Sequence, residues 1–416
     1  MSHDVVSSRV KEVIDTLWRD PGVRLAMDFL VRDQAARTEE NKEIALVQGE
    51  TGKEALGRSP LFQKKLAACG AEDCVIDGMG NVCGHIYGSS PRKKPLVMLE
   101  THLDTVFLED TPLAIVEKEG KIFCPGIGDN ASAMAQTLSI LRAIRHAGLR
   151  PVGVIMPTGA AREEGKGNFD GMRFLLQNRK DIDAAVIVDG GGTERIGWGG
   201  IGIKRYEFIF SGPRGHSWHI GGAPSALHAM GRAVAKIADI PMISDPKTTV
   251  NAGLVSGGST VGAVAGEARV QVDLRSADAG QLEKLAVRAL AAAEAGAAEE
   301  NAFKKDRPER ITLETICFGD MPAGRGLEGH ASVQAARYLT ELLGKTPIME
   351  GGTCTNGNIT VDRGIPTVIM GHGGYNGENH SLNEWYEPLD NYIAAQRAML
   401  TVFALAGLDG VTEPLL

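Results

Sequence analysis

The chain has 416 residues, of which 43% are hydrophobic and 23% are charged, a composition typical of a globular protein with room for two domains. Its formal net charge of −8 at pH 7 argues against a general binder of nucleic acid or of anionic membranes, because either would need a basic face. We therefore expect a small-molecule substrate, with no nucleic-acid partner and no membrane partner.

The N-terminal stretch reads MSHDVVSSRVKEVIDTLWRD, with charged residues every few positions and no continuous apolar segment. It lacks the features of a secretory signal, and no other stretch approaches the roughly 18 apolar residues of a membrane span. The six cysteines are scattered without C-x-x-C spacing, which favours free thiols in a chain of this size. These features predict a cytoplasmic protein.

The first 60 residues are predicted to be helical, because Val10, Val13, Ile14 and Leu17 recur at helix spacing. Farther along, apolar runs typical of strands alternate with amphipathic runs typical of helices, which indicates an α/β fold. The runs are two strands around a turn at 73–88, a strand at 95–104, a helix at 132–148, a strand at 152–158, a helix at 172–180 and a strand at 184–192.

The pattern changes near residue 202. A strand there is followed by a helix at 226–237, a hairpin-like pair of strands at 248–275 and an alanine-rich helix at 279–301, which together predict a βαββαβ-like module of the size of one small domain. A helix and strands of the first type then return. We expect one discontinuous α/β domain, formed by 1–201 and 316–416, with a smaller domain at 202–315 inserted in it.

Several predicted strand ends carry side chains that could bind a metal. In LETHLDTVF, His102 and Asp104 are two residues apart and point the same way on a strand, so one can bind a metal while the other orients its ring. Asp129 lies in a glycine-rich turn before a helix, Asp189 follows a strand, and His380 lies in a loop after another strand.

Two adjacent glutamates, Glu163 and Glu164, follow the strand at 152–158, at a place where open α/β sheets bind their ligands. Paired acids repel each other unless a cation or a shared proton compensates them. Together with the two histidines and the other acids they form a set of nitrogen and oxygen donors without thiolate. Such a set fits zinc, manganese or cobalt and is typical of hydrolytic metal pairs.

These segments resemble the M20 family of di-zinc hydrolases, which includes carboxypeptidase G2, peptidase T and aminoacylase-like branches. They follow the family's order and cover nearly all of the chain from residue 77 onward. The resemblance implies a mixed-sheet, zinc-peptidase-like catalytic domain with an inserted ferredoxin-like domain, which acts as a lid and as the surface of a homodimer. The matching segments are THLDTV, GIGDNASAMA, AREEGKGNFDGM, VDG, GHSW, NAGLVSGG, VDLRSAD, GGT and NHSLNEW.

The resemblance also implies roles for individual residues. Two divalent ions, zinc or manganese with cobalt as a further option, would share Asp129 as a bridging ligand, and the peptide bond after it would be cis. Glu163 would be the general base, and Asp104 would orient His102. The implied ligands are His102, Asp129 and Asp189 for one metal, and Asp129, Glu164 and His380 for the other.

In the inserted domain, the resemblance implies that His216, from the same or the partner subunit, stabilises the oxyanion, with His219 as a weaker candidate. Asn251 would shape the backbone or contribute to the same task. Arg275 would hold a substrate carboxylate, although an ion pair with Asp273 or Asp278 would equally explain it.

Three features depart from relatives in the family. Asp189 is the residue found in the peptidase T and aminoacylase-like branches, whereas the carboxypeptidase G2 branch has Glu there. Arg214 adds a cation just before the glycine that precedes His216. The segment 354–356 replaces the usual small or acidic residue after GGT. Arg214 and Arg275 together suit a substrate with a carboxylate, because guanidinium binds carboxylate in a bidentate way.

The sequence thus predicts a metal-dependent hydrolase that cleaves a C–N bond, amide or peptide, in a small carboxylate-bearing substrate. The alternative is an aminohydrolase that deaminates a small aromatic amine carboxylate such as a nitroanthranilate. A non-catalytic binding protein on the same scaffold is a remote alternative. A dinucleotide-dependent oxidoreductase is disfavoured, because no G-x-G-x-x-G follows a strand.

Overall fold

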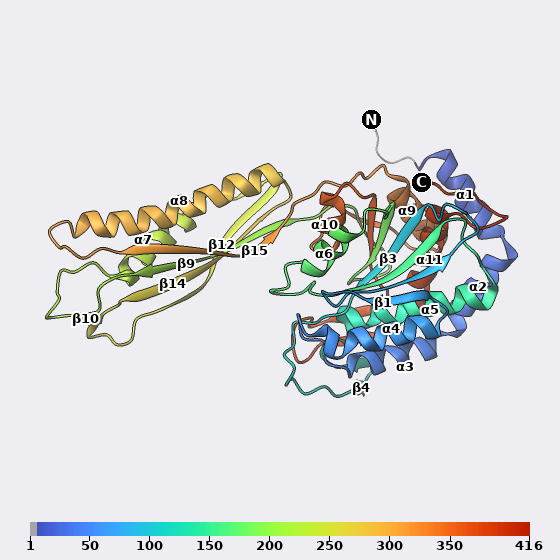
Figure 1. The fold of residues 1–416 in the computed structure, drawn as a ribbon, viewed down its shortest axis with the longest axis horizontal. Helices are drawn as coiled ribbons and strands as arrows, with labels where there is room; N and C mark the ends of the chain where they lie inside the picture. Colours follow the sequence, from blue (N-terminus) through green and yellow to red (C-terminus); the bar gives the residue numbers. More distant parts are fainter. Residues whose placement is uncertain (1–5) are drawn as a thin grey trace. The chain divides into compact units, whose positions relative to one another are not determined.

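The computed structural model describes residues 6–416, and the chain divides into two compact units, Met1–Gly200 with Arg325–Leu416 and Ile201–Gly324. Residues 1–5, which begin the stretch without a predicted secretory signal, lie outside the described part. Figure 1 gives the elements of each unit. No helix in the described part is both long enough and apolar enough to cross a membrane.

The first unit is built on an eight-stranded mixed sheet, which confirms the predicted α/β class. Strands β6, β3, β7 and β17 are parallel neighbours at its centre, whereas β2 runs antiparallel to β6. Every residue of β3 and β6 is buried, as expected for central parallel strands covered on both faces. In sheet order the strands are β1 (Glu72–Ile76), β2 (Val82–Tyr87), β6 (Val154–Ala160), β3 (Leu96–His102), β7 (Ala184–Val188), β17 (Thr367–Met370), β8 (Arg195–Gly197) and β16 (Ile348–Glu350).

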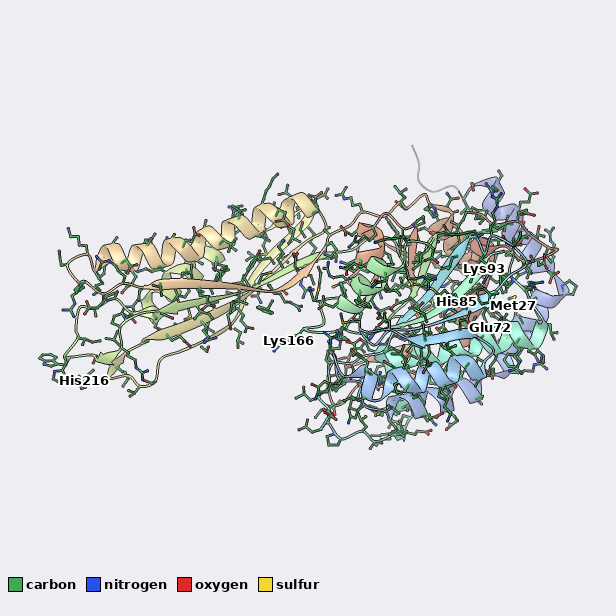
Figure 2. The ribbon with its side chains drawn as sticks, viewed as in Figure 1. Met27, Glu72, His85, Lys93, Lys166 and His216 are labelled. Atoms are coloured by element: carbon green, nitrogen blue, oxygen red, sulfur yellow. The ribbon has the colours of Figure 1, made fainter. Side chains whose placement is uncertain are left out.

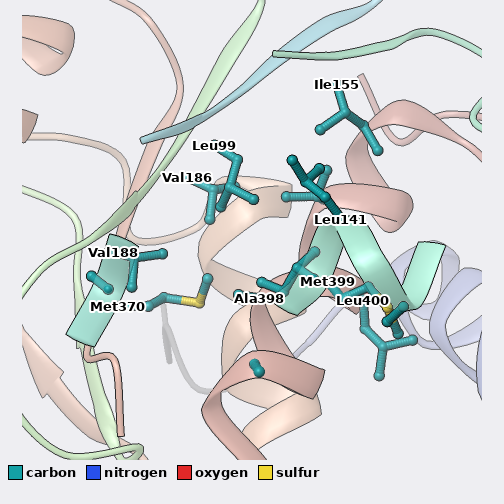
Figure 3. Packing of buried hydrophobic residues seen from close by; sticks show 14 of the residues in the cluster. Leu99, Leu141, Ile155, Val186, Val188, Met370, Ala398, Met399 and Leu400 are labelled. Atoms are coloured by element: carbon teal, nitrogen blue, oxygen red, sulfur yellow. The ribbon is translucent and has the colours of Figure 1, made fainter. Parts of the chain in front are cut away.

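The helices of this unit supply the rest of its core. In α1 the apolar residues Val10, Ile14 and Leu17 are buried, and the Ser7 hydroxyl accepts the N–H of Val10 to begin the helix. Helices α5 and α11 contact each other and β3, and part of the apolar cluster that they share is shown in Figure 3. The helices are α1 (Ser8–Arg19), α2 (Pro21–Arg32), α3 (Gln34–Ala45), α4 (Arg58–Ala68), α5 (Ser132–Ala147), α6 (Asp170–Asn178), α9 (Ala331–Leu342), α10 (Gly357–Asp362) and α11 (Asn391–Ala406), with the short turns η1 (Glu54–Leu56) and η2 (Ile127–Ala131).

A second, four-stranded sheet in the same unit was not predicted. Its strands are short and antiparallel, in the order β18 (Tyr375–Gly377), β19 (Trp385–Glu387), β5 (Lys121–Phe123) and β4 (Val116–Lys118). The pairing of β19 with β5 joins the chain just after His380 to the chain just before Asp129. This sheet therefore links two segments that carry candidate metal ligands.

The second unit has a five-stranded antiparallel sheet, and its long elements follow the predicted βαββαβ order. The strand order β12-β14-β9-β15 is that of a ferredoxin-like sheet, with the short β11 beyond β12. The predicted boundary at residue 315 falls inside β15, because this strand pairs with β9 as far as Met321. The elements are β9 (Gly202–Ser211), β10 (Gly215–His216), α7 (Ala226–Ala238), β11 (Ile243–Ser244), β12 (Lys247–Gly257), β13 (Ala263–Val264), β14 (Glu267–Ser276), α8 (Ala279–Phe303) and β15 (Thr312–Met321).

Candidate metal centre

The candidate ligands of the first unit come from the carboxyl ends of neighbouring parallel strands. His102 is the last residue of β3, and it stands opposite Ala160, the last residue of β6. Glu163 and Glu164 follow β6, and Asp189 follows β7, which pairs with β3. The sheet topology thus brings these side chains to one edge, where α/β sheets bind their ligands.

Asp129 lies at the centre of the cluster. Its Oδ1 is 2.9 Å from His102 Nε2, and its Oδ2 is 3.3 Å from His380 Nε2. The peptide bond between Asp129 and Asn130 is cis, as the resemblance implied. The two carboxylate oxygens of one side chain therefore face two different imidazoles.

The remaining acids complete two groups around Asp129. Asp189 Oδ1 is 3.9 Å from His102 Nε2, and Glu164 Oε1 is 3.0 Å from His380 Nε2. In each group the candidate ligand atoms lie within 4.8 Å of one another, and a third group joins His102 to both glutamates. The groups are His102, Asp129 and Asp189; Asp129, Glu164 and His380; and His102, Glu163 and Glu164.

Asp104 is fully buried behind these ligands. Its two carboxylate oxygens accept the backbone N–H groups of Glu163 and Glu164, at 2.9 Å each, so it fixes the turn that presents both glutamates. The Nδ1 atom of His102 is 3.1 Å from the backbone oxygen of Asp104 and 3.6 Å from its carboxylate. The sequence analysis predicted that Asp104 orients His102. It did not predict that Asp104 also holds the turn that carries Glu163 and Glu164.

The electrostatics of the cluster fit a cation. Burial, together with the neighbouring acids Asp189 and Glu164, raises the pKa of Glu163 well above its usual value, although His102 opposes the shift. Burial likewise raises the pKa of Asp189 to about 6. Negative charges crowded in a buried site are costly, and divalent cations would compensate them. The set of imidazole nitrogens and carboxylate oxygens suits zinc, manganese or cobalt.

For both histidines, contacts with acids raise the pKa by more than burial lowers it. Burial lowers the pKa of His102, but its contacts with Asp104 and Asp129 outweigh burial and raise the pKa well above the usual value. Hydrogen bonds with Asp129 and Glu164 raise the pKa of His380 to about 10. Burial raises the pKa of Asp129, yet these two imidazoles hold it below the usual range. Each imidazole is thus oriented towards the shared carboxylate.

Glu163 differs from the other acids. It belongs to a group with His102 and Glu164, but its carboxylate makes no hydrogen bond with any residue in the described part of the chain. Its backbone is fixed through Asp104, as described above. Its side chain is thereby held close to the candidate ligands.

Four supporting residues were missed by the sequence analysis. Glu384, in the segment that also carries His380, is buried and accepts three backbone N–H groups of the turn before Asp129. Buried Arg58 donates to the backbone oxygens of Val47 and Leu103. Glu384 lies inside the matching segment NHSLNEW, which was a signal that the sequence analysis did not use, whereas Arg58 lies outside all matching segments. The other two are Glu100 and His372, which are buried beside the cluster.

Glu100 explains part of the unusual segment after GGT. It lies two residues before His102 on β3, and burial raises its pKa to about 8. Its carboxylate accepts a hydrogen bond of 2.8 Å from the side-chain amide of Asn356. Asn356 is buried, whereas Cys354 is exposed. The altered segment thus contacts the strand that ends in His102.

The other candidate residues lie in the second unit, where Figure 2 marks His216. His216 is exposed, and its Nδ1 accepts the N–H of Trp218 at 3.2 Å, which leaves Nε2 as the ring's donor. The ring of His219 lies 4.9 Å from it, measured between centroids. Arg214 is exposed near His216.

Arg275 and Asn251 lie on adjacent strands of the second unit. The Nε atom of Arg275 donates to Asp273 at 2.7 Å. The ion pair with Asp273, which was the alternative explanation of Arg275, is therefore present. The side chain is nevertheless 44% exposed. Asn251 is exposed on β12, opposite Asp273 on β14.

The sequence and the fold both resemble known peptidases. The sequence profile of peptidase family M20/M25/M40 matches residues 98–404. The chain is 27% identical over 286 residues to carboxypeptidase G2 of Pseudomonas sp. (strain RS-16), an alignment that covers 66% of this chain and 65% of that protein. It thus spans slightly less than two thirds of the length of this relative.

Two solved structures show the similarity of the fold. One is aminopeptidase PepT from Bacillus cereus, with a TM-score of 0.72 and 22% identity over 89% of this chain and 99% of that chain. The other is a tripeptidase from Staphylococcus aureus, with a TM-score of 0.73 and 21% identity over 89% of this chain and 97% of that chain. At such low identity the similarity concerns the fold alone.

Proposed function

Because the chain belongs to peptidase family M20/M25/M40, we propose that it is a metal-dependent hydrolase that cleaves an amide or peptide C–N bond in a small carboxylate-bearing substrate. The observation that carries this proposal is the position of Asp129, whose two oxygens face His102 and His380 separately. A carboxylate so placed would be able to serve as a ligand shared by the two cations of a hydrolytic metal pair.

The cations would be zinc or manganese, with cobalt as a further option, because the ligands offer nitrogen and oxygen only. When bound, such a pair would polarise the substrate carbonyl and lower the pKa of water to about 7. The chain itself fixes the ligands through the sheet and through Asp104. The proposed ligands are His102, Asp129 and Asp189 for one ion, and Asp129, Glu164 and His380 for the other.

Glu163 is the proposed general base. Its carboxylate would take a proton from the attacking water and pass it to the leaving nitrogen, a role that requires an acceptor close to the reacting atoms and not bound elsewhere. Its partner Glu164 would be engaged with a cation.

In the second unit, His216 is the proposed donor to the oxyanion through Nε2–H, because its Nδ1 is occupied by the Trp218 N–H. Asn251 is a further candidate for this task. Arg214 and the exposed part of Arg275 would bind the substrate carboxylate. We include a homodimer formed through this unit in the proposal, with His216 acting in its own or the partner subunit's site.

The proposed location is the cytoplasm. The thiol of Cys317 is free and exposed, and Cys69, Cys74, Cys83 and Cys124 also form no disulfide. Free exposed thiols persist where the surroundings are reducing.

Product analysis by mass spectrometry tests the function. The protein would be loaded with zinc or manganese and given a mixed panel of dipeptides, N-acyl amino acids and aminobenzoates. Release of free amino acids would support the amide hydrolase. Ammonia with a hydroxylated aromatic acid would replace it with the aminohydrolase, and metal binding without turnover of any substrate would favour a binding protein.

A further inference from the structure

The carboxylate of Glu384 is buried and surrounded by backbone donors. Its Oε2 accepts the N–H of Gly126 at 3.0 Å, and its Oε1 accepts the N–H groups of Gly128 and Asp129 at 2.9 Å each. Glu384 itself has no exposed surface. One side chain thus satisfies three amides of the four-residue loop 126–129, which ends in the candidate bridging ligand.

The same glutamate belongs to the segment of the other candidate ligand. Glu384 is four residues after His380, and its backbone oxygen accepts the N–H of Cys124 at 3.1 Å. The pairing of β19 with β5 continues this connection. Glu384 therefore joins the segment of His380 to the segment of Asp129 through both its backbone and its side chain.

Two neighbours of Glu384, Gly128 and Arg58, favour this contact. A side chain on Gly128 would place its Cβ 3.4 Å from Glu384 Oε1 and only 3.0 Å from the Cβ of Asn376, so a residue larger than glycine would press on Asn376 beside the carboxylate. The buried guanidinium of Arg58 interacts electrostatically with Glu384 and with Asp104. Burial raises the pKa of Glu384 to about 7, and the three backbone N–H groups oppose this shift and offset part of the cost of burying the carboxylate.

We propose that Glu384 is a positioning residue that holds loop 126–129 in the arrangement needed for metal binding before any metal arrives. The inference rests on the proposed function, since Asp129 is positioned for a metal. Glu384 does not touch the reacting atoms. It acts through the backbone of Asp129, as the hydrogen-bond partners of metal ligands commonly act on metal affinity.

The substitution Glu384→Gln tests the inference. Glutamine keeps the size of the side chain but has one acceptor oxygen, and its NH₂ group would face one of the three N–H donors. We expect zinc affinity, measured by competition with a chromophoric chelator, to fall about 10- to 100-fold. The absorption spectrum of the cobalt-loaded protein should also change. Zinc affinity and a cobalt spectrum equal to those of the unsubstituted protein would overturn the inference.

Glu300→Gln is the matched control. Glu300 is also fully buried and also accepts a backbone N–H, that of Ser225 at 3.1 Å, but it lies in the second unit and pairs with Arg232. Its substitution should lower the melting temperature and leave zinc affinity unchanged. Equal losses of zinc affinity in both variants would show a general effect of destabilisation and would contradict a positioning role for Glu384.

Hydrogen exchange in the unsubstituted, metal-free protein provides a test that needs no variant to fold. The amides of Gly126, Gly128 and Asp129 should already be protected, because the carboxylate rather than a metal holds them. Exchange at the rate of unprotected amides would overturn the inference. If the protein bound no divalent metal, the proposed function would fail, whereas protected amides would still support the role of Glu384 in ordering the loop.

Discussion

The imidazole of His380 lies with its Nε2 atom 3.0 Å from Oε1 of Glu164, although 216 residues separate the two in the sequence. His380 is half exposed, whereas Glu164 is buried. A candidate ligand that is reachable from solvent thus lies beside a candidate ligand that is buried.

Glu163→Gln should abolish turnover while keeping the metals. The amide has the shape of the carboxylate but cannot accept a proton, so we expect kcat to fall by about 10² to 10⁴. Metal content of the purified variant, measured by elemental mass spectrometry, should equal that of the original protein. Retained turnover would remove Glu163 from the role of base.

His380→Ala should instead reduce metal content. The imidazole faces Asp129 and Glu164, and its loss removes one of three ligands at that position, so about one ion per chain should be lost on dialysis. His146→Ala is the control, because the ring of His146 packs at a tilt against Phe29, 4.8 Å away between ring centroids, outside the cluster. Two retained ions in His380→Ala would exclude His380 as a ligand.

His216→Ala should lower turnover without changing metal content. Loss of one donor to an oxyanion costs roughly 10²- to 10³-fold in kcat. His228→Ala replaces another exposed histidine of the second unit and should keep full activity. Mixed dimers of His216→Ala with Asp129→Ala should recover activity if the donor crosses between subunits, and no recovery would place His216 in its own subunit's site.

The stability of the first unit should depend on the protonation of His330. Burial lowers the pKa of His330 below its usual value, and its Nδ1 accepts the N–H of Ser332 at the start of α9. The unfolded chain therefore takes up the proton more readily. The contribution of neutral His330 to the free energy of unfolding is complete above the unfolded pKa of about 6.5. This contribution is lost as the pH falls through the lower pKa of the folded state.

The variant His330→Asn keeps an acceptor at this helix start but does not titrate. Relative to the original protein, its melting temperature should improve as the pH is lowered from 7.5 to 5. A difference between the two proteins that is the same at every pH would contradict the prediction.

The sequence predicted the parts of the site that lie at strand ends. The strand that ends at His102 is a long apolar run followed by polar residues, and the strands before Glu163 and Asp189 share this pattern. Patterns of this length identify a buried strand. The order of strands in the sheet then brings these side chains together. Asp129 and His380 lie in a turn and a loop, and their expected roles came from the resemblance to the M20 family.

The parts that were missed depend on contacts without a sequence pattern. The strands β4, β5, β18 and β19 have three residues each, which is too short for any periodicity to be recognised. Glu384 meets the N–H of Gly128 across 256 residues. Buried Arg58 is surrounded by groups from several segments, and a charged residue in a helix is ordinarily expected to be exposed.

The most direct test of the metal-dependent hydrolase is the amount of product released per chain as a function of bound metal. Protein stripped with a chelator would be reloaded stepwise with zinc or manganese and given the substrate found in the panel. The account predicts no C–N cleavage by the stripped protein and full recovery at two ions per chain. Undiminished cleavage by protein shown to contain no metal would contradict it.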